Sequence, residues 1–536
     1  MPTFTHEQAR AIATRDVSVA LSAGAGCGKT FVLTQRFLAH LDPADNPAEL
    51  SSLVAITFTD RAAREMRDRV RTTCRNRLAE CPLDQVDYWQ KLVRDLDGAR
   101  ISTIHSFCMT LLRSHAVEAR VDPQARLFDE TTGTAFLQQS LSTTLHDLLV
   151  ARDPAVIALF KAFGWEGALD LLGRLIPQRY RLRAADWIDR TPEELAELWR
   201  SAWRQDAVPI LLKELVESSS ARRVLELLRD NVPDHDVMAR RREILIDGLP
   251  ALAASPDPVS AVETLLENAA IKGGGTKKNW DSEEIYNDVR DALAELRESL
   301  KKLASKLQID SDSTGESAEI SLAALRAVTH AGAAYDQRKR DEGWLDFDDL
   351  LISARDLLRD HPDVRRRAAA GISLLMVDEF QDTDRLQAEI VRLLCGDNLA
   401  RGKLFLVGDI KQSIYRFRRA EPAVFRKLRQ ELPKAGRLPL TGNFRSQPAI
   451  LHFVNALCDS ALGGEYEPLA PQTPQITSGP CIEFLFAWPE AEPASEDDAA
   501  GVDSGREKVH VLRQREADWI ARRLRALLDG KSAVVR

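Results

Sequence analysis

The sequence predicts an α/β protein in which a parallel sheet, covered by helices on both faces, is interrupted by a large all-helical insertion. Short apolar runs rich in β-branched residues alternate with helical patterns over about the first hundred residues. From about residue 128 to residue 334 the pattern is nearly all helical, and strand-like runs return after residue 341. Buried strands that alternate with helices are typical of a parallel sheet, and the long helical stretch between them indicates an inserted domain.

The composition indicates a soluble, multi-domain chain. Its 536 residues exceed what one hydrophobic core usually holds, and 44% apolar with 29% charged residues excludes collagen, coiled coil and wholesale disorder. No stretch approaches the ~20 apolar residues of a membrane span, and the N-terminus lacks the apolar region of a secretory signal, so we expect no membrane association. Seven scattered cysteines without a C-x-x-C pair predict neither a disulfide framework nor a zinc site, and they favour the reducing cytoplasm.

Individual elements follow from local patterns. Strands are expected near residues 17–21, 53–58, 374–377, 404–407 and 438–441, and an arginine-rich helix is expected near 60–78. Loops are expected at 272–278, which is rich in Gly and Lys, and at 310–317, which is rich in Ser and Asp. Residues 489–506 hold six acids, one base and almost no large apolar residue, so we expect an acidic loop there, followed by a helix at 516–528.

The first strand leads into a run of small residues and then into a helix. This is the context of a phosphate-binding loop, in which backbone N–H groups surround a phosphate at a helix N-terminus. Lys29 would reach the β- and γ-phosphate oxygens and Thr30 would bind Mg²⁺. A glycine-rich turn without a ligand is the alternative, and Ala23 stands where the usual pattern has its first glycine. The predicted nucleotide-binding residues of this loop are Ser22, Ala23, Gly24, Ala25, Gly26, Cys27, Gly28, Lys29 and Thr30.

Two acids, Asp378 and Glu379, directly follow the buried strand near 374–377. In this fold class an Asp at this place completes the Mg²⁺ shell, and a neighbouring Glu orients and deprotonates the attacking water. A solvated acidic strand end is the alternative, which the phosphate loop upstream disfavours.

Gln412 follows the next strand and is placed to sense the γ-phosphate. Arg445 follows the last one and is a candidate arginine finger, which is worth ~10³–10⁵ in rate where it acts.

Two basic islands stand out on a chain whose net charge is −8. Residues 61–77 contain seven arginines and two acids, and residues 411–429 contain seven bases and one acid. Such islands suggest a polyanion surface, although a solvated helix face is the alternative. Aromatic and hydroxyl residues lie beside them at strand ends, which favours a groove for single-stranded nucleic acid, because aromatic rings stack bases. The candidate contacts are Thr57, Phe58, Thr103, His105, Tyr415 and Phe417.

In this order, these segments resemble the motifs of the UvrD/Rep family of superfamily-one DNA helicases. The phrases at 101–108, 345–350 and 413–418 are most similar to the AddA/RecB branch. The resemblance implies a RecA-like P-loop NTPase core. It implies a split ATPase domain 1A at 1–120 and 341–436, a helical insert 1B at 121–340, and an incomplete second RecA-like domain 2A at 437–536.

The resemblance also implies roles for individual residues. Gln8 matches the residue that reads adenine, and Phe444 matches the aromatic that packs on the base. Lys29, Glu379, Gln412 and Arg445 match the catalytic set, Thr30 and Asp378 match the metal ligands, and the six candidate contacts match residues that touch single-stranded DNA. Family members use ATP and Mg²⁺, translocate 3′→5′, and unwind duplex DNA in repair and recombination. An AddB-like partner is a further expectation.

The sequence departs from the family pattern at several points. Phe31 stands where many members have an Arg, Phe417 where many have Trp, and Asp60 where Asn is frequent. The later helicase motifs and the C-terminal nuclease domain typical of AddA and RecB have no counterpart in these residues, so we expect a fragment or truncated product. A catalytically inactive DNA- and ATP-binding scaffold is therefore the alternative to an active helicase. A P-loop kinase is disfavoured because it leaves the DNA-groove segments unexplained.

Two smaller hypotheses concern single features. Asp346, Asp348 and Asp349 suggest a metal site, but a helix start with Asp346 as its N-cap explains them more simply. Cys27 lies in the phosphate loop, where oxidation or alkylation of its thiol would abolish nucleotide binding.

Overall fold

Two units make up the part of the chain that the computed structural model describes, which is residues 4–307, 311–396, 399–463, 466–476, 478, 481–484 and 509–529. The α/β unit comprises Met1–Gln124 and Phe347–Arg536, and the helical unit comprises Ala125–Asp346. The predicted acidic loop at 489–506 lies outside the described residues. No helix within the described ranges has the length and hydropathy of a bilayer span.

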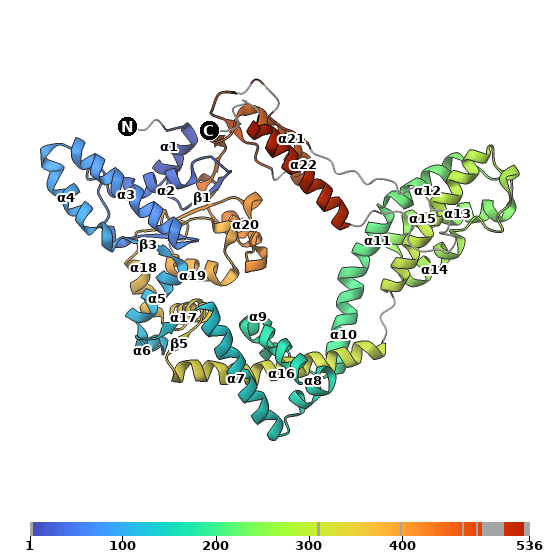
Figure 1. The fold of residues 1–536 in the computed structure, drawn as a ribbon, viewed down its shortest axis with the longest axis horizontal. Helices are drawn as coiled ribbons and strands as arrows, with labels where there is room; N and C mark the ends of the chain where they lie inside the picture. Colours follow the sequence, from blue (N-terminus) through green and yellow to red (C-terminus); the bar gives the residue numbers. More distant parts are fainter. Residues whose placement is uncertain are drawn as a thin grey trace. The chain divides into compact units, whose positions relative to one another are not determined.

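A six-stranded parallel sheet organises the α/β unit. Its strand order is β3-β2-β6-β7-β1-β8, so strands from the beginning of the chain pair with strands from beyond residue 370 (Figure 1). The prediction of an α/β fold with a parallel sheet and a helical insertion is confirmed. The strands are β1 (Val19–Ala23), β2 (Leu53–Thr57), β3 (Arg100–Thr103), β6 (Leu374–Val377), β7 (Leu404–Gly408) and β8 (Arg437–Leu440).

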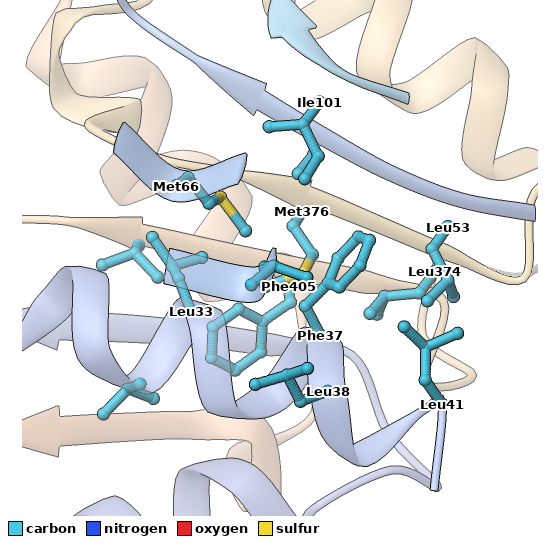
Figure 2. Packing of buried hydrophobic residues seen from close by; sticks show 14 of the residues in the cluster. Leu33, Phe37, Leu38, Leu41, Leu53, Met66, Ile101, Leu374, Met376 and Phe405 are labelled. Carbon is cyan, nitrogen blue, oxygen red and sulfur yellow. The ribbon is translucent and has the colours of Figure 1, made fainter. Parts of the chain in front are cut away.

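One face of this sheet packs on helices from the first hundred residues. Side chains alternate between the two faces of a strand, so Leu21, Leu53 and Phe405 point to one hydrophobic cluster, where Phe37 and Met66 meet them (Figure 2). The helices of the α/β unit up to residue 124 are α1 (His6–Ala13), α2 (Lys29–Ala39), α3 (Asp60–Glu80), α4 (Val86–Asp95), α5 (Ile104–Ser114) and α6 (Ala116–Ala119).

The alternate strand residues face the other side, and they are buried as well. In β6 all four residues are buried, and in β7 all five are. Burial on both faces explains why the strands read as continuous apolar runs. The helices of this unit after residue 346 are α17 (Phe347–Asp360), α18 (Pro362–Ala370), α19 (Arg385–Cys395), α20 (Pro422–Glu431), α21 (Pro448–Leu462) and α22 (Val509–Asp529).

The edge strand β8 begins at residue 437, where the sequence interpretation places the start of a second domain. Leu438 and Leu440 of β8 pair with β1 and join the same hydrophobic cluster. β8 therefore completes the first sheet, because its backbone pairs with the otherwise open edge of β1. Beyond it, β9 (Gly442–Asn443) pairs in parallel with β10 (Ala470–Pro471).

The helical unit confirms the predicted insertion but not one of its loops. Residues 311–317, expected as part of a loop, begin the longest helix of the unit, because Ser and Asp are also favoured at helix N-termini. The strands β4 (Arg126–Leu127) and β5 (Trp344–Leu345) pair near the two ends of this unit. Its helices are α7 (Glu130–Val150), α8 (Pro154–Leu175), α9 (Arg179–Leu182), α10 (Pro192–Ala202), a π-helical turn (Trp203–Ala207), α11 (Val208–Val216), α12 (Ser219–Asp230), α13 (Asp236–Ala251), α14 (Pro258–Asn268), α15 (Glu283–Leu307) and α16 (Ser311–Asp341).

Two glycines that each precede a strand by two residues provide a stability test of the sheet. Gly402 before β7 has φ +79°, and a Cβ there would lie 1.8 Å from the backbone oxygen of Arg15. Gly98 before β3 has no heavy atom within 4 Å of the equivalent position. We expect Gly402→Ala to destabilise the protein by more than about 2 kcal/mol and Gly98→Ala to change stability by less than about 0.5 kcal/mol. Urea unfolding followed by circular dichroism measures both, and equal midpoints would contradict this account.

Candidate active site

The carboxyl ends of all six strands lie at one edge of the sheet, because the strands are parallel. β1 ends at the predicted phosphate loop, β6 at Asp378 and Glu379, and β7 shortly before Gln412. β2 and β3 end at Thr57 and Thr103. The fold thus brings segments that are far apart in the sequence to a single edge.

The phosphate loop has the backbone of an anion site. Gly28 has φ 85° and precedes α2 without a side-chain cap, so the first N–H groups of this helix have no side-chain acceptor at the cap. Gly26 has φ 72°, and a Cβ there would lie 2.7 Å from the Cβ of Arg445 and 2.9 Å from Nδ2 of Asn443. Only glycine fits at position 26, because the segment that carries the candidate arginine finger packs directly on it.

Lys29 contacts two of the other predicted catalytic side chains. Its ammonium lies 3.0 Å from Oε2 of Glu379 and donates to Oε1 of Gln412 at 3.1 Å. The amide of Gln412 donates in turn to Asp409 at 2.7 Å. Three residues from three strand ends therefore converge on one point, as expected for groups that contact the same phosphate.

Gln381 is a site residue that the sequence interpretation missed. It is 1% exposed, its Nε2 donates to Oε2 of Glu379 at 2.8 Å, and its Oε1 accepts from the backbone N–H of Asp409 at 2.9 Å. Glu379 itself has φ 49°, a left-handed conformation that costs energy in a residue with a Cβ and that clusters at functional sites. A polar residue two positions after the paired acids was the available signal for Gln381.

Asp378 is a partly buried carboxylate that forms no ion pair within the described residues. Burial first, and the neighbouring negative charge of Glu379 second, raise the pKa of Asp378 to about 7. Thr30 lies at the start of α2, and its hydroxyl has no hydrogen-bond partner among the residues that the structure describes. An oxygen-only donor set that lacks positive charge fits Mg²⁺, which binds through one or two carboxylates together with substrate phosphates. The described residues hold no cluster of three His, Cys, Asp or Glu that would bind a metal unaided.

The residues expected around the base lie beside the same loop. Gln8 is 4% exposed, its Oε1 accepts from the N–H of Thr5 at 3.1 Å, and its Nε2 would lie 3.3 Å from a Cβ at Gly28. The N–H of Phe444 donates to the carbonyl of Gly26 at 2.9 Å, and the ring of Phe444 is half exposed.

Asn443, which the sequence interpretation also passed over, fixes the turn that carries Arg445. It is 2% exposed, and its Nδ2 donates to the carbonyl of Ala25 at 2.6 Å. Its Oδ1 accepts from the N–H groups of Arg445 and Ser446 at 2.9 and 2.8 Å. The guanidinium of Arg445 is exposed and has no partner among the described residues, so it is free to meet a ligand.

The predicted nucleic-acid contacts divide into two groups. Phe58 and Tyr415 lie 5.1 Å apart between ring centroids, Tyr415 and Phe417 lie 5.9 Å apart, and Phe417 is 78% exposed. These three rings form a row. Thr57 and Thr103 are buried instead, and their hydroxyls bond locally, to the carbonyl of Thr59 and to the N–H of Ser106. Their contact with DNA therefore stays a prediction.

His105 packs edge-on against Phe347 with centroids 5.2 Å apart. Burial lowers the pKa of His105, against the opposing effect of the charges on Asp348 and Asp60, so the imidazole is neutral at pH 7. Phe347 is half exposed and was missed, because the sequence interpretation took the acids around it as a helix start.

The acids around Phe347 do not form a metal site. Asp348 accepts two bonds from the guanidinium of Arg419, at 2.5 and 2.7 Å. Asp346 pairs with Lys339 at 2.7 Å. Because these carboxylates bind different cations and α17 begins at Phe347, the simpler interpretation as a helix start is supported.

The arginine island on α3 is partly neutralised. Arg61, Arg71 and Arg77 pair with carboxylates, and Arg67 donates to the carbonyl of Ile101 at 2.7 Å. The exposed arginines of this island whose side chains have no ion-pair partner in the described ranges are Arg64, Arg69 and Arg75.

Comparison with known proteins agrees with this geometry. Residues 4–433 match the UvrD/REP helicase N-terminal domain. The chain belongs to this helicase family. It is 27% identical to the AddA subunit of the ATP-dependent helicase/nuclease of Pelotomaculum thermopropionicum over 98% of its own length and 46% of that protein. It is 29% identical to the AddA subunit of Exiguobacterium sibiricum, over 86% of this chain and 40% of that protein. It is 25% identical to the AddA subunit of Bacillus cereus strain AH820, over 98% of this chain and 45% of that protein.

These comparisons confirm the predicted family and its AddA-like branch. The chain spans slightly less than half the length of the relatives that it matches.

The raised pKa of Asp378 makes stability depend on pH. Its pKa in the folded protein lies near 7, above its ordinary 3.8, so the metal-free protein loses stability as pH rises from about 4 through about 7. Asp378→Asn removes this loss. In EDTA we expect the variant to be more stable than wild type by roughly 2–4 kcal/mol at pH 8, with a smaller difference at pH 5. Thermal unfolding at both pH values measures this, and a difference independent of pH would refute it.

The structure corrects the hypothesis that Cys27 is reactive. Its side chain is fully buried, and burial, followed by the charges of Asp409 and Glu7, raises the pKa of Cys27 to about 11. We expect iodoacetamide at pH 8 to modify Cys27 at least about 100-fold more slowly than the partly exposed Cys81, with or without ATP. Peptide mapping by mass spectrometry gives both rates, and rapid labelling of Cys27 that ATP prevents would restore the original hypothesis.

Proposed function

We propose that this chain carries the ATPase core of an ATP-dependent DNA helicase that translocates 3′→5′ and acts on single-stranded and duplex DNA in recombination and double-strand break repair. One observation carries the proposal. The ammonium of Lys29 bonds to both Glu379 and Gln412, at the same sheet edge as the aromatic row that includes Tyr415. A phosphate site and a base-stacking surface are thus built on the same strand ends.

The phosphate loop would hold ATP through its backbone N–H groups and through Lys29, with Gln8 and Phe444 at the adenine. Thr30 and Asp378 would hold Mg²⁺, which neutralises charge on the phosphate oxygens. A bound γ-phosphate replaces the acceptors of Lys29, so the carboxylate of Glu379 becomes free to accept a proton from water.

Two further residues would respond to the γ-phosphate. Gln412 loses its bond from Lys29 when phosphate arrives and can bond to the phosphate itself. Arg445, which lacks a partner within the described residues, would stabilise the charge that develops during transfer.

Base stacking would supply the grip on DNA. Each base that stacks on an aromatic ring contributes about 1–3 kcal/mol, and Phe58, Tyr415 and Phe417 offer adjoining rings. Phe347 beside His105 extends the set of exposed aromatic groups. Tyr415 lies three residues after Gln412, so a movement of the γ-phosphate sensor displaces the stacking ring.

The wider assembly is also part of the proposal. We assign residues 1–120 and 341–440 to a RecA-like domain 1A, residues 121–340 to an inserted domain 1B, and the following residues to the beginning of domain 2A. The relatives are each named as one subunit of a helicase/nuclease, which supports an AddB-like partner in the cytoplasm. The alternative is an inactive scaffold, which would use the same contacts to bind ATP and DNA without turnover.

Replacing the proposed base separates these alternatives. We expect Glu379→Gln to reduce DNA-stimulated ATP hydrolysis by about 10²–10⁴, because general-base catalysis is lost, while the affinity for a fluorescent ATP analogue stays within about threefold. Lys29→Ala is the contrasting variant and should lose nucleotide affinity as well. Turnover above a tenth of wild type in Glu379→Gln would refute the role of Glu379. ATP and DNA binding without turnover in wild type would favour the scaffold.

A further inference from the structure

Residues 466–469, here called the strap, lie on the start of the phosphate loop. The Cδ2 of Leu469 would lie 2.3 Å from a Cβ at Gly24, so the two segments are in direct contact. The hydroxyl of Ser22 donates to Oε2 of Glu467 at 2.6 Å. The strap therefore contacts the loop twice, once through an apolar side chain and once through a charge-assisted hydrogen bond.

The strap is held in place by α21. Asn455 of this helix accepts at Oδ1 from the N–H of Leu469 at 3.0 Å and from the hydroxyl of Tyr466 at 2.8 Å. Its Nδ2 donates to the carbonyl of Leu469 at 2.9 Å. One amide side chain thus fixes both ends of the strap, which leaves the carboxylate of Glu467 in a defined position.

The second oxygen of Glu467 contacts a different part of the unit. Oε1 lies 3.2 Å from the guanidinium of Arg429, on the last turns of α20. α20 follows directly on the segment that carries the aromatic row, and the N–H of Ala420 donates to the carbonyl of Tyr415 at 3.1 Å. Glu467 accordingly connects the helix that follows the stacking ring with Ser22, the first residue of the phosphate loop.

We infer that Glu467 is a positioning residue that couples DNA binding to the phosphate loop, an inference that rests on the function proposed above. A base that stacks on Tyr415 displaces the start of α20 and, with it, Arg429. Glu467 moves with Arg429 because charge-assisted hydrogen bonds are strong and directional. Ser22 moves with Glu467 for the same reason. This route is distinct from the one through Gln412, since neither Ser22 nor Arg429 forms a hydrogen bond or ion pair with Lys29 in the described residues.

Reciprocal binding measurements on the full chain test the inference. The affinity for a fluorescent oligo-dT is measured with and without a non-hydrolysable ATP analogue and Mg²⁺, and the affinity for the analogue with and without oligo-dT, all at one salt concentration. Coupling between two sites is the same factor from either side. We expect Glu467→Gln, which keeps an acceptor for Ser22 but loses the ion pair with Arg429, to reduce this factor about five- to tenfold in both measurements.

Two more variants make the result specific. Arg429→Gln should cause the same loss, and the double variant should lose no more, because both changes break one link. Glu431→Gln is the matched control. Glu431 lies on α20, as Arg429 does, but its ion-pair partner is Arg392 of α19, at 2.6 Å, and not a residue of the strap. A merely structural role would change the individual affinities and leave the coupling factor as in wild type, which would overturn the inference. A wild-type chain whose two affinities are independent would overturn both the inference and the coupled motor proposed above.

Discussion

Parallel pairing between strands that are distant in the sequence is the constraint on which the site depends. β1 pairs with β7 and β8, and β2 pairs with β6, across most of the length of the chain. Because all strands run in one direction, each ends at the same edge, and each can contribute a polar residue there without disturbing the buried sheet. The insertion of the helical unit between β3 and β6 leaves this register intact, since it adds residues only to a connection.

The charges at this edge are balanced only in part. Lys29 meets Glu379 and Gln412, while Asp378 lies partly buried beside Glu379 with a raised pKa. An arrangement of this kind is short of positive charge around the carboxylates and has one exposed arginine, Arg445, nearby in the turn that packs on Gly26. A phosphate group bound with a divalent cation would balance these charges. The cation would compensate the carboxylates, and the phosphate oxygens would accept hydrogen bonds from Lys29. The backbone strain at Glu379 fits a residue whose position matters more than its contribution to stability.

Under the proposed function, the same short stretches of chain would serve the phosphate side and the DNA side. Gln412 and Tyr415 belong to one connected turn after β7, and α20 continues from it. The strap adds a second connection, which starts from the far end of α20 and reaches the loop through Glu467. Under that proposal, two connections would link a ring that stacks bases to a loop that holds phosphate, so DNA binding would reach the phosphate loop by more than one route.

Sequence alone determined the fold class and predicted the candidate catalytic side chains, because both leave local signals. Apolar runs mark strands buried on two faces, and small residues before Lys29 or acids after a strand have few other uses. Tertiary structure alone decided which residues support these groups. Gln381 and Asn443 form hydrogen bonds to residues that follow other strands, and Arg429, the partner of Glu467, lies 38 positions away, so no local pattern shows which residues they contact. It also decided that Cys27 is buried, since exposure depends on how distant segments pack over a loop, and the sequence of this loop does not reveal that packing.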